Sequence, residues 1–173
     1  MDPGKSIVEA TRGLNLDLMT AELSDEVLQL FRSSILVHLD NAVRAAARNT
    51  QESMSVAMWE LHLMTEKSMK LLLKQQGAIC PNTHDLSQLR ALADSTADSA
   101  CINKDFKNIL STSKAISFRY CDAGHVSAEA FMKLYLASVA VTSFYAEKLQ
   151  RSLSIRNARI LLKKPTWLKL PDA

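Results

Sequence analysis

The chain has few residues that interrupt regular secondary structure. Only four glycines and four prolines occur in its 173 residues, and long stretches containing neither lie between them. Because sheets of short strands need frequent turns, this scarcity argues against such a fold and favours long helices. We therefore expect an all-α fold.

Long apolar runs are also missing. No uninterrupted apolar segment approaches the roughly 20 residues that a membrane-spanning helix needs. A secretory signal has a basic start followed by an apolar segment. Residues 1–10 do not show this pattern. We expect no membrane association and a cytoplasmic location.

Cysteine is scarce and scattered. Cys80, Cys101 and Cys121 lie in separate segments, with no Cys-x-x-Cys pair and no histidine at zinc-finger spacing. This pattern predicts reduced thiols in or near the core. We assign no metal site and no cofactor to the chain.

The overall composition is typical of one globular domain, and the C-terminal end is basic. Apolar residues make up 47% of the chain and charged residues 23%, which is ordinary for a folded domain. Seven basic residues and no acidic one fall between Lys148 and Leu170, so the positive charge is concentrated there. We divide the chain into an N-terminal arm (1–20, extended or helical), a helical bundle (21–155) and a basic C-terminal tail (156–173).

The periodicity of apolar residues predicts two long helices in the first half. The first follows Ser24, a suitable N-cap, and the second follows Asn49 or Thr50 and stops at Gly77. One face of the second helix is apolar at steps of three and four: Met54, Ala57, Met58, Leu61, Met64, Thr65, Ser68 and Leu72. Its apolar surface is wider than one stripe, which suggests that a second face packs against a neighbouring subunit.

Three further helices are expected. A short one covers residues 82–93, capped by Asn82 or Thr83, and a third long one covers 103–120 with Ile116 facing inward. The fourth long helix starts at Ser127 and can continue to Lys164, because no breaker occurs before Pro165. Four long helices with short connections favour an antiparallel bundle of four to five helices.

Several of these residues together resemble the HEPN domain (higher eukaryotes and prokaryotes nucleotide-binding). They are the helix end with Glu66, Lys67 and Lys70, then Gly77, Pro81, Thr83-His84-Asp85-Leu86, and Arg119-Tyr120-x-Asp122. The resemblance covers residues 24–155. Family members usually have proline after the Arg-Tyr pair, where this chain has Cys121.

The resemblance implies a bundle that forms a homodimer through its long helices. Some HEPN domains bind nucleotides or act beside a nucleotidyltransferase, and others are metal-independent endoribonucleases with an Arg-x(4–6)-His motif, some paired with an antitoxin. Our leading hypothesis is a nucleotide- or RNA-binding module with Arg119 and Tyr120 among its contacts. The alternatives are an endoribonuclease and a non-catalytic structural partner of a nucleotidyltransferase or antitoxin.

Arg119 and His125 are the candidate catalytic pair, since five residues separate them. A histidine can take the proton of a ribose 2′-hydroxyl while a guanidinium holds the phosphate. On one continuous helix the two side chains would lie about 240° apart, so the helix must break at Gly124 or a second subunit must complete the pair. The other interpretation is a helix-end arginine and a solvated loop histidine. Arg32 and His38 have the same spacing.

The sequence allows more than one role for the remaining histidines and for the basic tail. His84 either packs over the preceding helix end or lies at a cleft, and His62 is interpreted as a structural histidine. In the tail, Lys163 and Lys164 could contact a phosphate backbone while Trp167 stacks on a base. Alternatively, the apolar residues of the tail dock on the bundle and the lysines face water.

Overall fold

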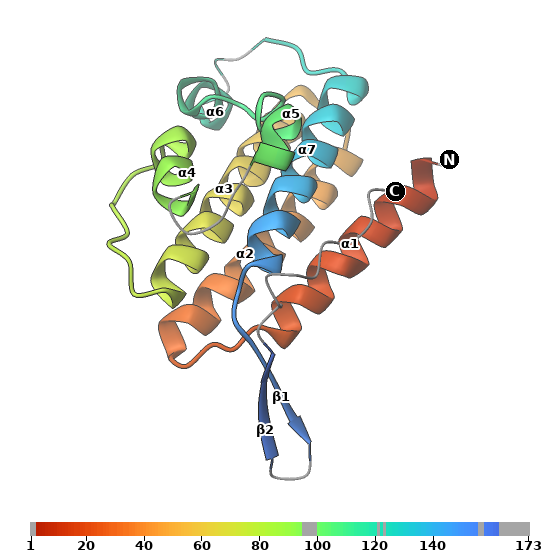
Figure 1. Ribbon diagram of the computed structural model, residues 1–173. Coiled ribbons are helices and arrows are strands. Elements are labelled where there is room, and N and C mark those ends of the chain that lie inside the picture. Colours follow the sequence, from red (N-terminus) through yellow and green to blue (C-terminus); the bar gives the residue numbers. More distant parts are fainter. Residues whose placement is uncertain (1–2, 95–99, 121, 123, 156–157, 163–173) are drawn as a thin grey trace.

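The computed structural model describes residues 3–94, 100–120, 122, 124–155 and 158–162, and it is predominantly helical, as predicted (Figure 1). Four helices are long: α1 (Pro3–Thr20), α2 (Glu26–Ala47), α3 (Gln51–Gln75) and α7 (Ala128–Glu147). The shorter elements are α4 (Leu86–Asp94), the 3-10 turn η1 (Ala100–Ile102), α5 (Asn103–Phe106) and α6 (Thr112–Arg119). A hairpin follows, formed by β1 (Arg151–Ile155) and β2 (Ala158–Leu162).

Helices α2 and α3 begin at side-chain caps. Asp25, one residue after the expected Ser24, accepts a hydrogen bond from the backbone N–H of Leu28 and caps α2. Thr50 caps α3 and forms a reciprocal capping box with Ser53. Each cap satisfies an N–H group that has no partner inside its helix.

Helix α3 lies at the centre of the molecule. It packs against α2, α4, α6 and α7, and every residue of its predicted apolar face is buried. The wide apolar surface of α3, which suggested a contact with a second subunit, is therefore covered by helices of the same chain.

The end of α3 is fixed by Gly77. Its φ is +69°, in the left-handed region that glycine enters without steric cost. The N–H of Gly77 donates to the carbonyl of Lys74 and that of Ala78 to the carbonyl of Leu73. These two bonds form a Schellman motif, so the predicted stop at Gly77 is confirmed.

The long helix predicted over residues 103–120 is wrong, because the chain turns between α5 and α6. Ser111 caps α6 by accepting from the N–H of Lys114, and serine favours such a cap over a helix interior. Because of this break, a different face of α6 points toward the core than the prediction gave. Ala115 and Phe118 are buried, whereas Ile116 is exposed.

Residues 1–20 were predicted as an arm that could be extended or helical, and the described part is the helix α1. Its Leu14 and Leu18 are fully buried, and α1 packs against α7. The hydroxyl groups of Thr11 and Tyr135 lie 3.3 Å apart across this contact. Helix α1 is therefore part of the core.

Helix α7 starts after the predicted cap Ser127, whose Oγ accepts from the N–H of Ala130. It ends at Glu147, so the predicted continuation to Lys164 is wrong. The chain instead enters the hairpin, whose register pairs Arg151 with Leu162 and Ile155 with Ala158. The expected boundary at residue 155/156 falls between these two strands, which project from one end of the helices (Figure 1).

The start of the hairpin is tied to the helices by Gln75, the last residue of α3. Its side-chain amide donates to the carbonyl of Glu22, and its Oε1 accepts from the N–H of Gln150. The carbonyl of Gln150 in turn accepts from the N–H of Glu22. The segments after α1, α3 and α7 therefore meet at one point. Within the described residues, none of the helices has the length and apolar character needed to cross a membrane.

Candidate functional site

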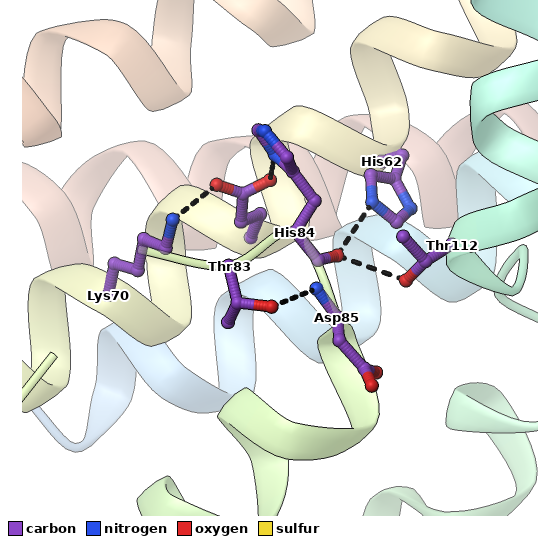
Figure 2. A network of polar contacts seen from close by, with 7 residues as sticks. His62, Lys70, Thr83, His84, Asp85 and Thr112 are labelled. Atoms are coloured by element: carbon purple, nitrogen blue, oxygen red, sulfur yellow. Dashed lines mark hydrogen bonds and ion pairs between the residues drawn. The ribbon is translucent and has the colours of Figure 1, made fainter. Parts of the chain in front are cut away.

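A buried carboxylate on α3 holds two cationic or potentially cationic side chains. Glu66 is 1% exposed, and its Oε1 accepts from Nζ of Lys70 at 2.7 Å. Its Oε2 lies 2.8 Å from Nδ1 of His84, on the loop between α3 and α4. Figure 2 labels Lys70 and His84 and marks these two contacts with dashed lines.

Hydrogen bonds with neighbouring residues fix the backbone around His84. The carbonyl of His84 accepts from Oγ1 of Thr112 on α6 and lies 3.2 Å from Nε2 of His62 on α3 (Figure 2). Oγ1 of Thr83 accepts from the N–H of Asp85, and Oδ1 of Asp85 accepts from the N–H of Ser87. Asp85 therefore caps α4, which begins later than the predicted residue 82, and neither Asn82 nor Thr83 is its cap.

The proton positions at this network follow from its chemistry. Burial alone would raise the pKa of Glu66, but hydrogen bonds and charge from Lys70 and His84 outweigh it and hold the pKa below its ordinary value. An ionised carboxylate can only accept hydrogen bonds, so Nδ1 of His84 carries a proton and donates it. When His84 is neutral, its Nε2 therefore has a free lone pair.

The Trp59 indole connects the histidines to α6. The ring of His62 stacks on it at 5.6 Å between centroids, and the ring of His84 lies at 6.2 Å in a tilted arrangement. The guanidinium carbon of Arg119 lies over the same indole, 5.3 Å from its centroid. Trp59 thus brings His84 and Arg119 to one region of the surface.

Arg119 is the residue of the candidate pair whose position best suits ligand binding. Its side chain is exposed in the last turn of α6, 5.6 Å from the ring of Tyr120, which is itself 63% exposed. Within the part of the chain that the structure describes, no carboxylate lies within ion-pair distance of Arg119. Its guanidinium lies near both aromatic rings, and it donates no hydrogen bond to any of the described residues.

His125 is placed apart from Arg119 within one chain. Its Nδ1 lies 3.1 Å from Oε1 of Gln51 at the first residue of α3, and it borders a hollow of about 350 Å³ that Arg119 does not line. Gln51 and Trp59, which anchor His125 and Arg119, are separated by about 12 Å along α3. Within the described residues, no hydrogen bond or ring contact joins Arg119 to His125.

A groove of about 520 Å³ separates the start of α4 from the start of α6. The two helix ends that face it are already capped, α4 by Asp85 and α6 by Ser111. Among the described residues, no group of three or more histidine, cysteine or acidic side chains is arranged to hold a metal ion. The predicted contacts Lys163, Lys164 and Trp167 lie outside the described residues.

Sequence reasoning identified Arg119, Tyr120 and His84 but missed the residues that connect them. Glu66 and Lys70 were noted only as part of the family resemblance, and Trp59 was assigned no functional role. One signal was available: Glu66 falls between Thr65 and Ser68 on the buried face of α3, where an ionised side chain needs a partner. Lys70, one turn later, supplies it.

Comparisons with known proteins were made for the whole chain. No protein-family model, curated protein or solved structure gives a significant match. The arrangement of residues around Trp59 is therefore the basis for the function proposed below.

Proposed function

We propose that this protein is a HEPN-like helical module that binds RNA or a nucleotide, with a phosphate held by Arg119 and a base stacked on Tyr120. The observation that carries the proposal is the Arg119 guanidinium, 5.3 Å from the Trp59 ring and without a carboxylate partner in the described residues. The resemblance of residues 24–155 to HEPN domains supports the same conclusion.

The chemistry of these side chains fits a phosphate and a base. A guanidinium presents planar N–H donors that match phosphate oxygens, and contact with Trp59 restricts the side chain before binding. Tyr120 offers an exposed ring, and stacking on an aromatic side chain contributes about 1–3 kcal/mol per base. Trp59 is partly buried and stacks on His62, whereas Tyr120 is 63% exposed, so Tyr120 is the stacking surface.

The remaining features of the proposal come from the sequence. Lys163, Lys164 and Trp167 extend the contact along a nucleic acid strand. The module acts in the cytoplasm as a homodimer. One alternative is an endoribonuclease that uses Arg119 and His125, and the other is a non-catalytic structural partner of a nucleotidyltransferase or an antitoxin.

Fluorescence anisotropy with a labelled single-stranded RNA tests the proposal. Arg119→Ala should weaken binding by about 10-fold or more, because each hydrogen bond to a charged group contributes about 1.5–3 kcal/mol. The matched control is Arg44→Ala, which removes the same charge from an exposed ion pair with Asp40 on α2. This control should bind as the wild type does.

Three outcomes are informative. Equal losses in the two variants would show that net charge alone drives binding and would contradict a site at Arg119, as would the absence of binding by the wild type. A chain ending at residue 162 keeps β2 paired with β1 and removes the three tail contacts. If this shorter chain binds as tightly, with the same salt dependence, the tail makes no phosphate contacts.

A further inference from the structure

We infer that the hairpin of β1 and β2 is a docking site for an extended segment of a partner protein, which adds to β2 as a third strand. In this segment, acidic residues alternate with apolar ones. Three features carry the inference: the free edge of β2, the apolar face that the strand register creates, and the basic character of the surrounding sequence. The site shares no residue with the proposed RNA contacts.

The two edges of the hairpin differ. The outer edge of β1 is covered at its first residue, where Ala21 forms an antiparallel bridge with Arg151. The Arg151 guanidinium also donates to Oδ1 of Asp17 on α1. Along β2, by contrast, the only backbone–backbone pairing within the described residues is with β1. The outer peptide groups of Ala158–Leu162 are therefore free to pair with another strand.

The register of the hairpin separates its residues into two faces. Residues directly opposite each other share a face, and neighbours along a strand alternate between faces. One face contains one basic and five apolar residues: Arg151, Leu153, Ile155, Ala158, Ile160 and Leu162. The other face contains Ser152, Ser154, Arg159 and Leu161. The hairpin is therefore amphipathic.

The hairpin is attached to the helices only at its base. Of the described helices, α1 alone makes more than marginal contact with it, through β1, and Gln75 bonds the backbone of Gln150 just before β1. The strands extend past the ends of the helices (Figure 1). A two-stranded hairpin is marginally stable by itself in water, and a third strand beside an apolar face stabilises it.

Charge determines which kind of strand fits this edge. The segment from Lys148 to Leu170, which contains the hairpin, has seven basic residues and no acidic one. A second copy of the hairpin would bring the same positive charge, and like charges on neighbouring strands are destabilising. A strand with acidic residues beside Arg159 and apolar residues beside Ile160 complements both faces. Because strands have a period of two, these residues must alternate.

A nucleic acid complements the charge of the hairpin but not its other features. Phosphates attract basic residues, yet a phosphate backbone neither pairs with the peptide groups of a strand edge nor covers an apolar face. Strand addition uses both, since main-chain hydrogen bonds provide affinity and alternate side chains provide specificity. The combination of edge, face and charge therefore favours a polypeptide.

Fluorescence anisotropy on the full chain, with labelled synthetic peptides, tests this docking site. The probe is a peptide of about seven residues, slightly longer than a typical strand, in which valine and glutamate alternate. One control peptide has lysine in place of glutamate, and the other has a central proline, which removes a backbone donor. The wild type should bind the probe and neither control. Binding of the probe should also slow hydrogen exchange at the outer amides of β2.

Two pairs of variants test the residues of the hairpin. Arg159→Glu should weaken probe binding by about 10-fold, because an attractive cross-strand pair becomes repulsive. Its matched control is Arg48→Glu, which makes the same charge change at the exposed residue after α2 and should bind normally. Ile160→Thr keeps a β-branched residue but removes apolar contact, and it should weaken binding by about 5-fold. Leu161→Thr, on the opposite face, should have a smaller effect.

Four results would overturn the inference. They are equal losses for Arg159→Glu and Arg48→Glu, equal binding of the probe and its proline version, and absence of probe binding by the wild type. The fourth is self-association in light scattering that Ile160→Thr abolishes, which would assign the edge of β2 to a second copy. If the probe does not bind and Arg159→Glu weakens binding of a single-stranded RNA, the hairpin contacts nucleic acid instead. Probe binding that Arg119→Ala leaves unchanged would stand even if the wild type binds no RNA.

Discussion

At the scale of single residues, the surroundings of His62 constrain its charge state. It is 1% exposed and stacks on Trp59. Burial lowers its pKa below the ordinary value of 6.5, although the charge of Glu66 and the carbonyls of His84 and Leu110 favour the protonated form. His62 is therefore neutral in the folded protein.

This neutrality predicts a loss of stability in acid. Between pH 6.5 and the lower pKa of folded His62, the unfolded chain binds more protons at His62 than the folded chain does, so the free energy of unfolding falls as pH falls. The contribution of one group is at most about 1.4 kcal/mol per pH unit. Urea unfolding over this range should show a shallower pH dependence for His62→Gln, whose amide can still bond the carbonyl of His84. Identical slopes would contradict a neutral His62.

The residues of the site were only partly predictable. Arg119, Tyr120 and His84 stood out because they belong to the short motifs that resemble the HEPN domain. Their connection through Trp59 was not, because residues 59, 84 and 119 come together only when α3, the following loop and α6 pack. The different contacts of Arg119 with Trp59 and of His125 with Gln51 depend on the same packing.

At the scale of elements, the C-terminal turn of α3 offers a matched pair of substitutions. Gly77→Ala puts a Cβ on a residue with φ of +69°, where space is open but the backbone is strained. The left-handed conformation costs an L-residue about 1–2 kcal/mol. Gly13→Ala, inside α1 and also in open space, should instead stabilise the protein by about 0.5–1 kcal/mol.

Thermal or urea unfolding of the two variants checks both signs. Opposite shifts are expected from the same chemical change, and a stabilising Gly77→Ala would contradict the left-handed turn. Local signals explain why this turn, the Thr50 cap and the Ser127 cap were predictable. The break before Ser111 and the hairpin were not, because helix and strand patterns compete there and the packing of α6 and α7 decides.

At the scale of the whole molecule, the burial of α1 predicts that the N-terminal helix stabilises the entire fold. Leu18→Ala should lower the free energy of unfolding by about 2–5 kcal/mol, the range for a buried leucine. The neighbouring Leu16→Ala, at a position that is 62% exposed, should have little effect. Urea unfolding followed by circular dichroism distinguishes the two, and equal small effects would mean that α1 is a detachable arm.

The contact between α1 and α7 also affects how the chain folds during its synthesis. The apolar face of α1 emerges from the ribosome long before α7, against which it packs. Until about residue 150 has been made, Leu14 and Leu18 have no native partner on α7, and the junction of Glu22, Gln75 and Gln150 cannot close. The nascent chain therefore exposes the apolar face of α1 until α7 has been made, which makes it a candidate for chaperone binding during that interval.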